Sequence, residues 1–197
     1  DILEKVAFNA LPAAISPDWT SHQYDQQVNQ MVCNVAPRPW SNGPDANLFG
    51  LEPNFGCCTA NMHQGWPKLT SHLWMKDREE GLAAVSYAPC TVRTTVGQGV
   101  AVVVEVRGEY PFKDRVQIKL SLERPESFPL SLRIPAWCDH PVITLNGHKL
   151  EFQVTSGYAR LVQNWQSGDR LDIHLPMEVR TSSRSMYAAS IERGPLV

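Results

Sequence analysis

The stretch "DRVQIKLSLE", Asp114–Glu123, decides the fold class of most of this chain. Its apolar residues stand at every second position: Val116, Ile118, Leu120 and Leu122. Because side chains alternate between the two faces of a strand, this spacing predicts a strand with one buried face. Two later stretches alternate in the same way, at Leu130, Leu132 and Ile134 and at Leu171, Ile173 and Leu175.

Short apolar runs separated by turn residues continue on both sides of this stretch, from about residue 82 to the end. In "LNGHKL", the pair Asn146-Gly147 predicts a tight hairpin turn. Many short strands at this spacing are typical of an antiparallel β-sandwich. We therefore predict a sandwich domain over residues 81–197, with its boundary near "KDREEG", residues 76–81.

The preceding part, residues 1–80, has a helical pattern instead. Apolar residues repeat at helical spacing over residues 1–16, and Pro12 predicts a kink there. A second helix is predicted over residues 59–76, with Pro67 as a defect inside it, so that either its first turn is separate or the helix starts late. The chain is thus predicted to be an α+β multidomain protein, with a helical part followed by the sandwich.

Polar, weakly charged residues fill the segment between the two helices. Residues 19–35 alternate in character and predict an extended segment, with His22, Tyr24 and Gln26 on one face. Amides and phenols hydrogen-bond neutral hydroxyls without bringing charge, so this face suits a pocket wall. A loop whose polar side chains bond the backbone is the alternative. Residues 36–56, dense in Pro, Gly, Asn and Asp, predict a loop.

Composition excludes several classes of partner. The net charge is -2 over 197 residues, and no basic stripe predicts a nucleic acid or an anionic membrane. The apolar run "VAVVVEV" is far too short to span a bilayer. The chain starts at Asp1 without Met, so we expect a piece of a longer protein. A signal peptide cannot be judged, and bacterial cytoplasm and periplasm both stay open.

Two of the five cysteines, Cys57 and Cys58, are adjacent in "NFGCCTAN". Three interpretations are open: a pair of buried thiols, a strained vicinal disulfide, or a metal or nucleophile site. A position at the start of a helix would favour the third interpretation, because unpaired N–H groups there lower a thiol pKa. Further zinc ligands would have to come from a set of nearby side chains, namely Cys33, Glu52, His63 and His72. No second C-x-x-C or H-x-x-x-H supports a self-contained zinc site.

These motifs in this order resemble a known family. "FGCCTAN" at a helix start is followed by "QGWPKLTSHLWM", and "FNALPAAISPDWTSHQYDQQVNQ" precedes them. Downstream come "YPFKDRVQIKL", "FPLSLRIPAWC", "VITLNG", "GYARLVQNWQSGDRLDIHLPMEVR" and "ERGPLV". Over nearly its whole length, the chain resembles the β-L-arabinofuranosidases of glycoside hydrolase family 127, formerly a domain family of unknown function (DUF1680).

The resemblance implies an (α/α)6 barrel, with residues 1–80 as its C-terminal end, followed by the β-sandwich. It also implies a retaining glycoside hydrolase acting on L-arabinose-containing or related plant-type glycans. Cys57 would be the nucleophile, and both Cys57 and Cys58 would bind Zn²⁺. The family's other zinc ligands, from a Glu-x-Cys motif, and its acid/base Glu would lie upstream of Asp1, because this sequence has no Glu-x-Cys. We therefore expect the chain alone to be inactive.

Substrate contacts are also implied by the resemblance. Tyr24 falls on a Tyr that faces the sugar pocket, and His22 and Gln26 are further candidates through their shared face. Asn61 would either orient the cysteine turn or touch substrate, and Trp66 is predicted to be core. The remaining cysteines are predicted to be structural thiols: Cys33, Cys90 and Cys138.

A second function stays open beside the enzyme. The sandwich can be a non-catalytic carbohydrate-binding or structural module, because this fold hosts many functions. Sugar binding by exposed indoles without zinc would support that function, and the candidates are Trp40, Trp137 and Trp165. "CCTAN" also differs from the "CCPPN" of some relatives, which indicates a different subgroup. The sugar, its linkage and the oligomeric state are not predicted.

Overall fold

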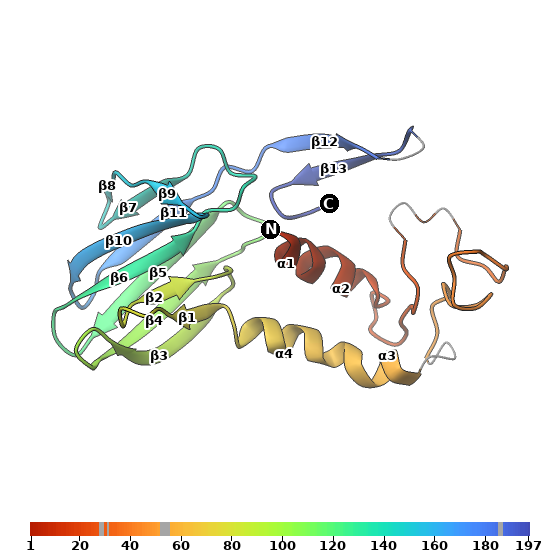
Figure 1. Ribbon diagram of the computed structural model, residues 1–197, viewed down its shortest axis with the longest axis horizontal. Coiled ribbons are helices and arrows are strands. Elements are labelled where there is room, and N and C mark those ends of the chain that lie inside the picture. Colours follow the sequence, from red (N-terminus) through yellow and green to blue (C-terminus); the bar gives the residue numbers. More distant parts are fainter. Residues whose placement is uncertain (28–29, 31, 52–55, 185–186) are drawn as a thin grey trace. The chain divides into compact units, whose positions relative to one another are not determined.

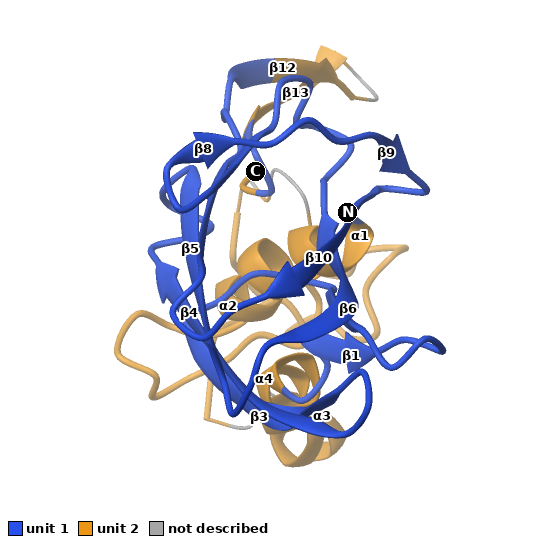
Figure 2. Cartoon of the chain, turned by 90° about the vertical axis from the view of Figure 1, so that its left-hand side faces the viewer, with its two compact units in different colours: residues 1, 71–180, 193–195 blue, residues 2–70, 181–192, 196–197 orange. Residues whose placement is uncertain are grey.

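The computed structural model describes residues 1–27, 30, 32–51, 56–184 and 187–197 (Figure 1). The chain divides into two compact units, which Figure 2 colours blue and orange. Unit 1 contains Asp1 and residues 71–180 and 193–195. Unit 2 contains residues 2–70, 181–192 and 196–197. None of the described helices is long and apolar enough to cross a membrane.

Two sheets build unit 1. One has the order β1 (Trp74–Lys76), β2 (Leu82–Ala84), β6 (Glu126–Arg133), β10 (Tyr158–Trp165) and β9 (Val154–Thr155). The other has the order β3 (Cys90–Val96), β4 (Val100–Gly108), β5 (Arg115–Leu122), β11 (Arg170–His174), β7 (Val142–Leu145) and β8 (His148–Lys149). Neighbours pair antiparallel except β2 and β6, which are parallel. The predicted sandwich is confirmed, with this one parallel pair as a departure.

Alternation along each strand supplies the core of unit 1. On β5, the predicted residues Val116, Ile118, Leu120 and Leu122 are all buried. From the other sheet, β10 buries Trp165 completely, and its Nε1 donates a hydrogen bond of 2.9 Å to the Phe128 carbonyl on β6. Burying each such side chain stabilises the fold by about 1.5–3 kcal/mol. Apolar burial on two facing sheets is what holds this unit.

The predicted hairpin turn is confirmed at the end of β7. Asn146 and Gly147 have φ of 52° and 84°, the left-handed pair that a type I′ turn needs. The turn joins β7 to β8, with Leu145 opposite His148. Asn146 Oδ1 also accepts from the Arg170 N–H at 2.9 Å, which ties the turn to β11.

The first predicted helix is confirmed but ends at residue 13. It consists of α1 (Ile2–Lys5), a π-helical turn (Val6–Ala10) and α2 (Leu11–Ala13). The Leu11 N–H bonds the Val6 carbonyl, five residues back. Pro12 cannot donate a backbone bond and its ring crowds the preceding turn. The predicted disturbance therefore takes the form of a wider turn just before Pro12.

The second predicted helix, over residues 59–76, is wrong at both ends. Helical structure begins earlier, with α3 (Gly56–Asn61), a 3-10 turn (Met62–Gln64) and α4 (Gly65–Thr70). Pro67 lies in the first turn of α4, where its missing N–H costs nothing. Trp74–Lys76 instead pairs with Leu82–Ala84, since Asp77 Oδ1 accepts the Gly81 N–H at 2.7 Å and closes the connection.

The last strands form a sheet of their own, made of β12 (Val179–Ser183) and β13 (Ala189–Arg193). Within unit 2, Glu192 on β13 makes ion pairs with Lys5 on α1 at 2.6 Å and with Arg184 at 2.8 Å. The Val197 N–H also donates to Asn9 Oδ1 at 2.8 Å. Polar contacts therefore connect the C-terminal segment of unit 2 to its N-terminal helix.

Candidate functional site

The adjacent cysteines lie in the first turn of α3, as Gly56 begins the helix directly before them. Cys57 is exposed and Cys58 is half-buried. Their sulfur atoms are 3.9 Å apart, whereas a disulfide bond measures about 2.05 Å. The structure therefore shows neither the vicinal disulfide nor a fully buried pair, and it presents two free thiols at the surface of unit 2.

Side chains along the helix brace this turn. Asn61 Nδ2 donates to the Cys57 carbonyl at 2.7 Å, and Gln64 Nε2 donates to Asn61 Oδ1 at 2.8 Å. Of the two roles expected for Asn61, the structure shows the orienting one. The carbonyl of the residue that carries the first thiol is thereby fixed.

Electrostatics act against the free thiolate at Cys58. Burial raises its pKa, and the neighbouring Cys57 and then the charge of Asp25 raise it further. The expectation that a helix start lowers the thiol pKa is wrong at this cysteine, because burial, the Cys57 thiol and the Asp25 charge all raise it. The raised pKa favours the protonated thiol of Cys58. Asp25 was not predicted as part of the site.

The spacing of the two thiols is compatible with a metal ion. Two sulfurs bound to one tetrahedral zinc, each at about 2.3 Å, lie about 3.8 Å apart. The Cys57–Cys58 separation of 3.9 Å matches that edge of a tetrahedron. Among the described residues, no group of three or more His, Cys, Asp or Glu could hold a metal. The pair thus offers two of the four ligands that a structural or catalytic zinc takes.

The other candidate ligands lie elsewhere. Cys33 donates its S–H to the Asn47 carbonyl at 2.9 Å. His63 is exposed in the 3-10 turn, and His72 belongs to unit 1, where Ser71 Oγ lies 2.9 Å from its Nδ1. Glu52 lies outside the described residues. Among the described residues, none of Cys33, His63 and His72 forms a possible metal-ligand group with the thiol pair.

The extended segment predicted over residues 19–35 is wrong in its described part. Only His22 pairs as in a sheet, with Ile15 on one side and Gly50 on the other. The backbone N–H groups of Gln23 and Asp25 bond separate partners instead, the carbonyls of Ala14 and Ala46. Without a continuous partner strand, alternation in the sequence has no sheet face to follow.

The three predicted substrate contacts therefore sit in different surroundings. His22 is buried, with 5% of its surface exposed, and its Nε2 lies 2.9 Å from Thr59 Oγ1 on α3. Tyr24 is half-buried, and its hydroxyl accepts from Asn42 Nδ2 at 3.0 Å. Gln26 is exposed. The bond between His22 and Thr59 connects the polar segment to the cysteine helix, and no periodicity in the sequence signals it.

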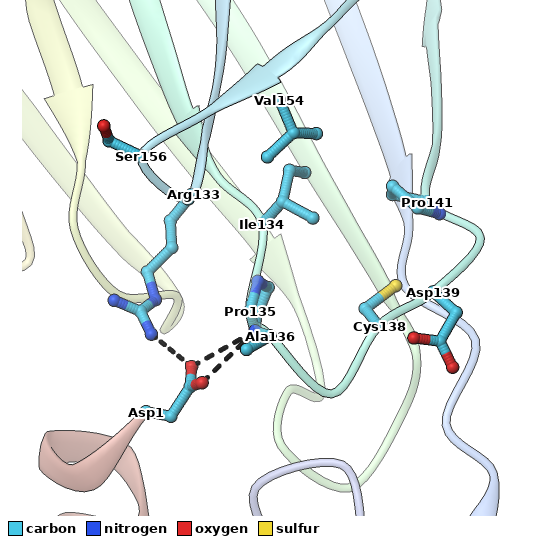
Figure 3. A pocket seen from close by; sticks show the side chains of 11 residues that line it. Asp1, Arg133, Ile134, Pro135, Ala136, Cys138, Asp139, Pro141, Val154 and Ser156 are labelled. Atoms are coloured by element: carbon cyan, nitrogen blue, oxygen red, sulfur yellow. Dashed lines mark hydrogen bonds and ion pairs between the residues drawn. The ribbon is translucent and has the colours of Figure 1, made fainter.

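A hollow of about 530 Å³ lies in unit 1, at one end of the sandwich (Figure 3). The Asp1 carboxylate points into it and accepts from Arg133 Nη2 and from the Ala136 N–H (Figure 3). Burial raises the pKa of Cys138, in the same wall, to about 11. Since the Asp1 carboxylate pairs with Arg133, the Asp139 carboxylate pairs with Arg180, and the raised pKa keeps the Cys138 thiol protonated, we assign this hollow no catalytic role.

The exposure of the tryptophan side chains bears on the alternative function, a non-catalytic carbohydrate-binding module. Trp165 is fully buried and Trp137 is half-buried, while Trp40 is 41% exposed with the Arg38 guanidinium 5.6 Å from its ring centre. Trp66 is half-buried, and its ring centre lies 5.4 Å from that of Trp19. Of the three indoles that a sugar-binding module would use, only Trp40 has the required exposure.

Comparisons with known proteins agree with this fold. Residues 81–177 match the family model of the β-L-arabinofuranosidase GH127 middle domain. A solved GH127 β-L-arabinofuranosidase from Geobacillus stearothermophilus T6 superposes with a TM-score of 0.81 at 22% identity. The superposed region covers 98% of this chain and 31% of the chain of that enzyme. Comparison with proteins of curated function gave no significant match.

Two further solved structures are similar. A glycoside hydrolase gives a TM-score of 0.80 at 20% identity, and a GH127 β-arabinofuranosidase gives 0.76 at 21%. Each covers 98% of this chain, while 33% and 32% of their own chains are covered. This chain thus spans about a third of the length of these relatives, with which it shares a fold. Residues 81–177 thus resemble a GH127 middle domain, and nearly the whole chain shares the fold of solved GH127 β-L-arabinofuranosidases.

Proposed function

We propose that this chain is the end of the catalytic barrel and the sandwich of a retaining glycoside hydrolase similar to the β-L-arabinofuranosidases. Its substrates would be L-arabinose-containing or related plant-type glycans. The observation that carries the proposal is the exposed thiol pair, 3.9 Å apart at the start of α3, in a chain that also carries the GH127 middle domain.

Cys57 is the nucleophile in this proposal, since it is the more exposed of the two thiols. Its sulfur attacks the anomeric carbon as the bond from that carbon to the leaving oxygen breaks. An acid protonates the leaving oxygen. Water then attacks the anomeric carbon and gives its proton to the conjugate base of that acid, the C–S bond breaks and the thiolate is regenerated, so that two displacements retain the configuration.

Cys58 acts beside it as a metal ligand. Its raised pKa leaves it protonated at neutral pH, so it is a poor nucleophile without a cation. Zinc, when bound by both thiols, supplies the positive charge that keeps them deprotonated. The remaining zinc ligands and the acid/base Glu would come from the part of the protein that precedes Asp1, as in the family.

Polar side chains between the two helices would bind the sugar. Asn42 holds the Tyr24 hydroxyl in place, which suits a residue that hydrogen-bonds a substrate hydroxyl. The Nδ1 atom of His22 is buried without a partner among the described residues. Gln26 is exposed and offers an amide. All three stay predictions for substrate binding.

Hydrolysis of p-nitrophenyl β-L-arabinofuranoside tests the proposal. The chain alone should release no nitrophenol above background, because it lacks the acid. The full-length parent protein should be active, and Cys57→Ser in the parent should abolish turnover, while Cys33→Ser serves as a matched thiol control. Turnover by the chain alone would contradict the expected inactivity. Full activity in the Cys57→Ser parent would refute the nucleophile, whereas a parent protein without activity would favour the non-catalytic sandwich module.

A further inference from the structure

We infer that His22 is a positioning residue, which holds the Cys57–Cys58 turn in place through Thr59. The inference rests on the proposed function for its significance and deepens it at the same site. It assigns His22 a role through α3 that is separate from the sugar contact proposed above.

The backbone of His22 is anchored on two sides. Its N–H donates to the Gly50 carbonyl at 2.9 Å, and the Gly50 N–H donates back at 3.1 Å. On the other side, His22 bridges Ile15, directly after the first helix. The imidazole therefore extends from a fixed point in unit 2 and not from a free loop.

The imidazole itself is buried and has one partner among the described residues. Its Nε2 lies 2.9 Å from Thr59 Oγ1, while its Nδ1 is buried without a partner there. Losing the Thr59 bond would leave the buried ring without a hydrogen-bond partner among the described residues, which is costly. The ring and the hydroxyl are thus strongly constrained to stay together.

The bond between His22 and Thr59 connects α3 to another segment of unit 2. None of the residues of α3 is fully buried, so apolar packing does little to fix its position. The bond from Asn61 to the Cys57 carbonyl is internal to the helix region and cannot anchor it to other segments. Thr59 follows the two cysteines directly, so fixing its side chain fixes the rotation of the turn that carries both thiols.

The test compares Thr59→Val, which removes the hydroxyl, with Thr59→Ser, which keeps it, in this chain. Thr59 is exposed, so both variants should fold. We expect Thr59→Val to speed amide exchange over residues 57–61 by about tenfold and to weaken Cd²⁺ binding by the thiol pair about tenfold, as for supports of other metal ligands. Thr59→Ser should stay within about twofold of the original for both.

Two controls separate positioning from a general loss of structure. Thr70→Val removes an exposed hydroxyl on α4 that bonds only the Pro67 carbonyl, and it should change neither readout. His22→Leu should reproduce Thr59→Val, and the double variant should be no worse than either single one. Equal behaviour of Thr59→Val and Thr59→Ser would overturn the inference. If the original chain binds no Cd²⁺ through these thiols, the zinc proposal fails, while amide exchange still decides the role of His22.

Discussion

The two units are stabilised by different kinds of interaction. Unit 1 buries a large set of aliphatic and aromatic side chains between two sheets, with Trp165 and Leu120 completely inaccessible. Over residues 2–70, the buried apolar side chains among the described residues are only alanines, Ala7 and Ala46. The larger buried side chains there are polar: Glu4, His22, Gln23 and Asn47. The region that carries the thiol pair is held by hydrogen bonds, and the sandwich by apolar burial.

The largest effect should come from emptying the sandwich core. Trp165→Ala removes a fully buried indole and its bond to the Phe128 carbonyl, which should lower the free energy of unfolding by about 3–5 kcal/mol. Urea denaturation measures it. Val162→Ala on the same strand, where Val162 is 55% exposed, should cost well under 1 kcal/mol. Similar losses in the two variants would contradict burial as the main stabilising interaction of this unit.

Removing a single thiol should affect the polar region alone. Cys58→Ser should weaken Cd²⁺ binding by on the order of 100-fold, since one of two sulfur ligands is lost. The thiolate absorption of the Cd²⁺ complex measures it, with Cys33→Ser as the control. The urea midpoint of the sandwich should not move. Retained affinity in Cys58→Ser would show that the two cysteines do not act as a pair.

Backbone strain at a sandwich turn should have an intermediate effect. Gly147 has φ of 84° with open space around its Cα, so Gly147→Ala costs only the strain of the left-handed conformation. We expect about 1–2 kcal/mol of lost stability, measured by urea denaturation. Asn146→Gly, at the preceding turn position, should also lose stability: glycine tolerates φ of 52°, but it removes the bonds of the Asn146 side chain to the Arg170 N–H and to Asp169. An unchanged midpoint in Gly147→Ala would mean that the turn can adopt another type.

Acid should loosen the polar unit before the sandwich. The bond from Lys5 lowers the pKa of Glu192 from 4.5 to about 2, with help from Ser182 and Ser190. A lowered carboxyl pKa contributes stability above pH 4.5 that is lost as the pH falls toward 2. Amide exchange over residues 2–13 should therefore rise across that window, and Glu192→Gln should show the rise already at neutral pH. Exchange in Glu192→Gln that keeps the original acid dependence would refute this ion pair as its cause.

The sequence predicted the sandwich better than the polar region that carries the thiol pair. Alternation at Val116, Ile118 and Leu120 predicted the strands correctly, because the hydrophobic period is itself the physical cause of strand burial. The extended segment failed, because His22 and Gln23 are buried by individual hydrogen bonds, which leave no period in the sequence. Pro67 indicated correctly that the first turn is separate, since a proline inside a helical pattern can mark where a new helix begins.

The candidate site was predicted in part for the same reason. The adjacency of Cys57 and Cys58 is visible in the sequence, and the structure adds that both are accessible. Two interactions at the pair join segments that are distant in the sequence. His22 lies within hydrogen-bond distance of Thr59, and the charge of Asp25 raises the pKa of Cys58. Contacts of that kind depend on loop paths, which residue types alone do not specify.

The parallel pairing of β2 with β6 has a consequence for the order of folding. Leu82 on β2 lies beside Leu130 on β6, and all of β3, β4 and β5 lie between them along the chain. Those three strands can pair in sequence as local hairpins, since each is the neighbour of the next. The sheet that contains β2 must wait until β6 has been synthesised, and closing that long loop is entropically slow. During synthesis, β2 can pair with the preceding β1, but its other edge would stay unpaired, so chaperone binding and aggregation are expected to concentrate at that edge.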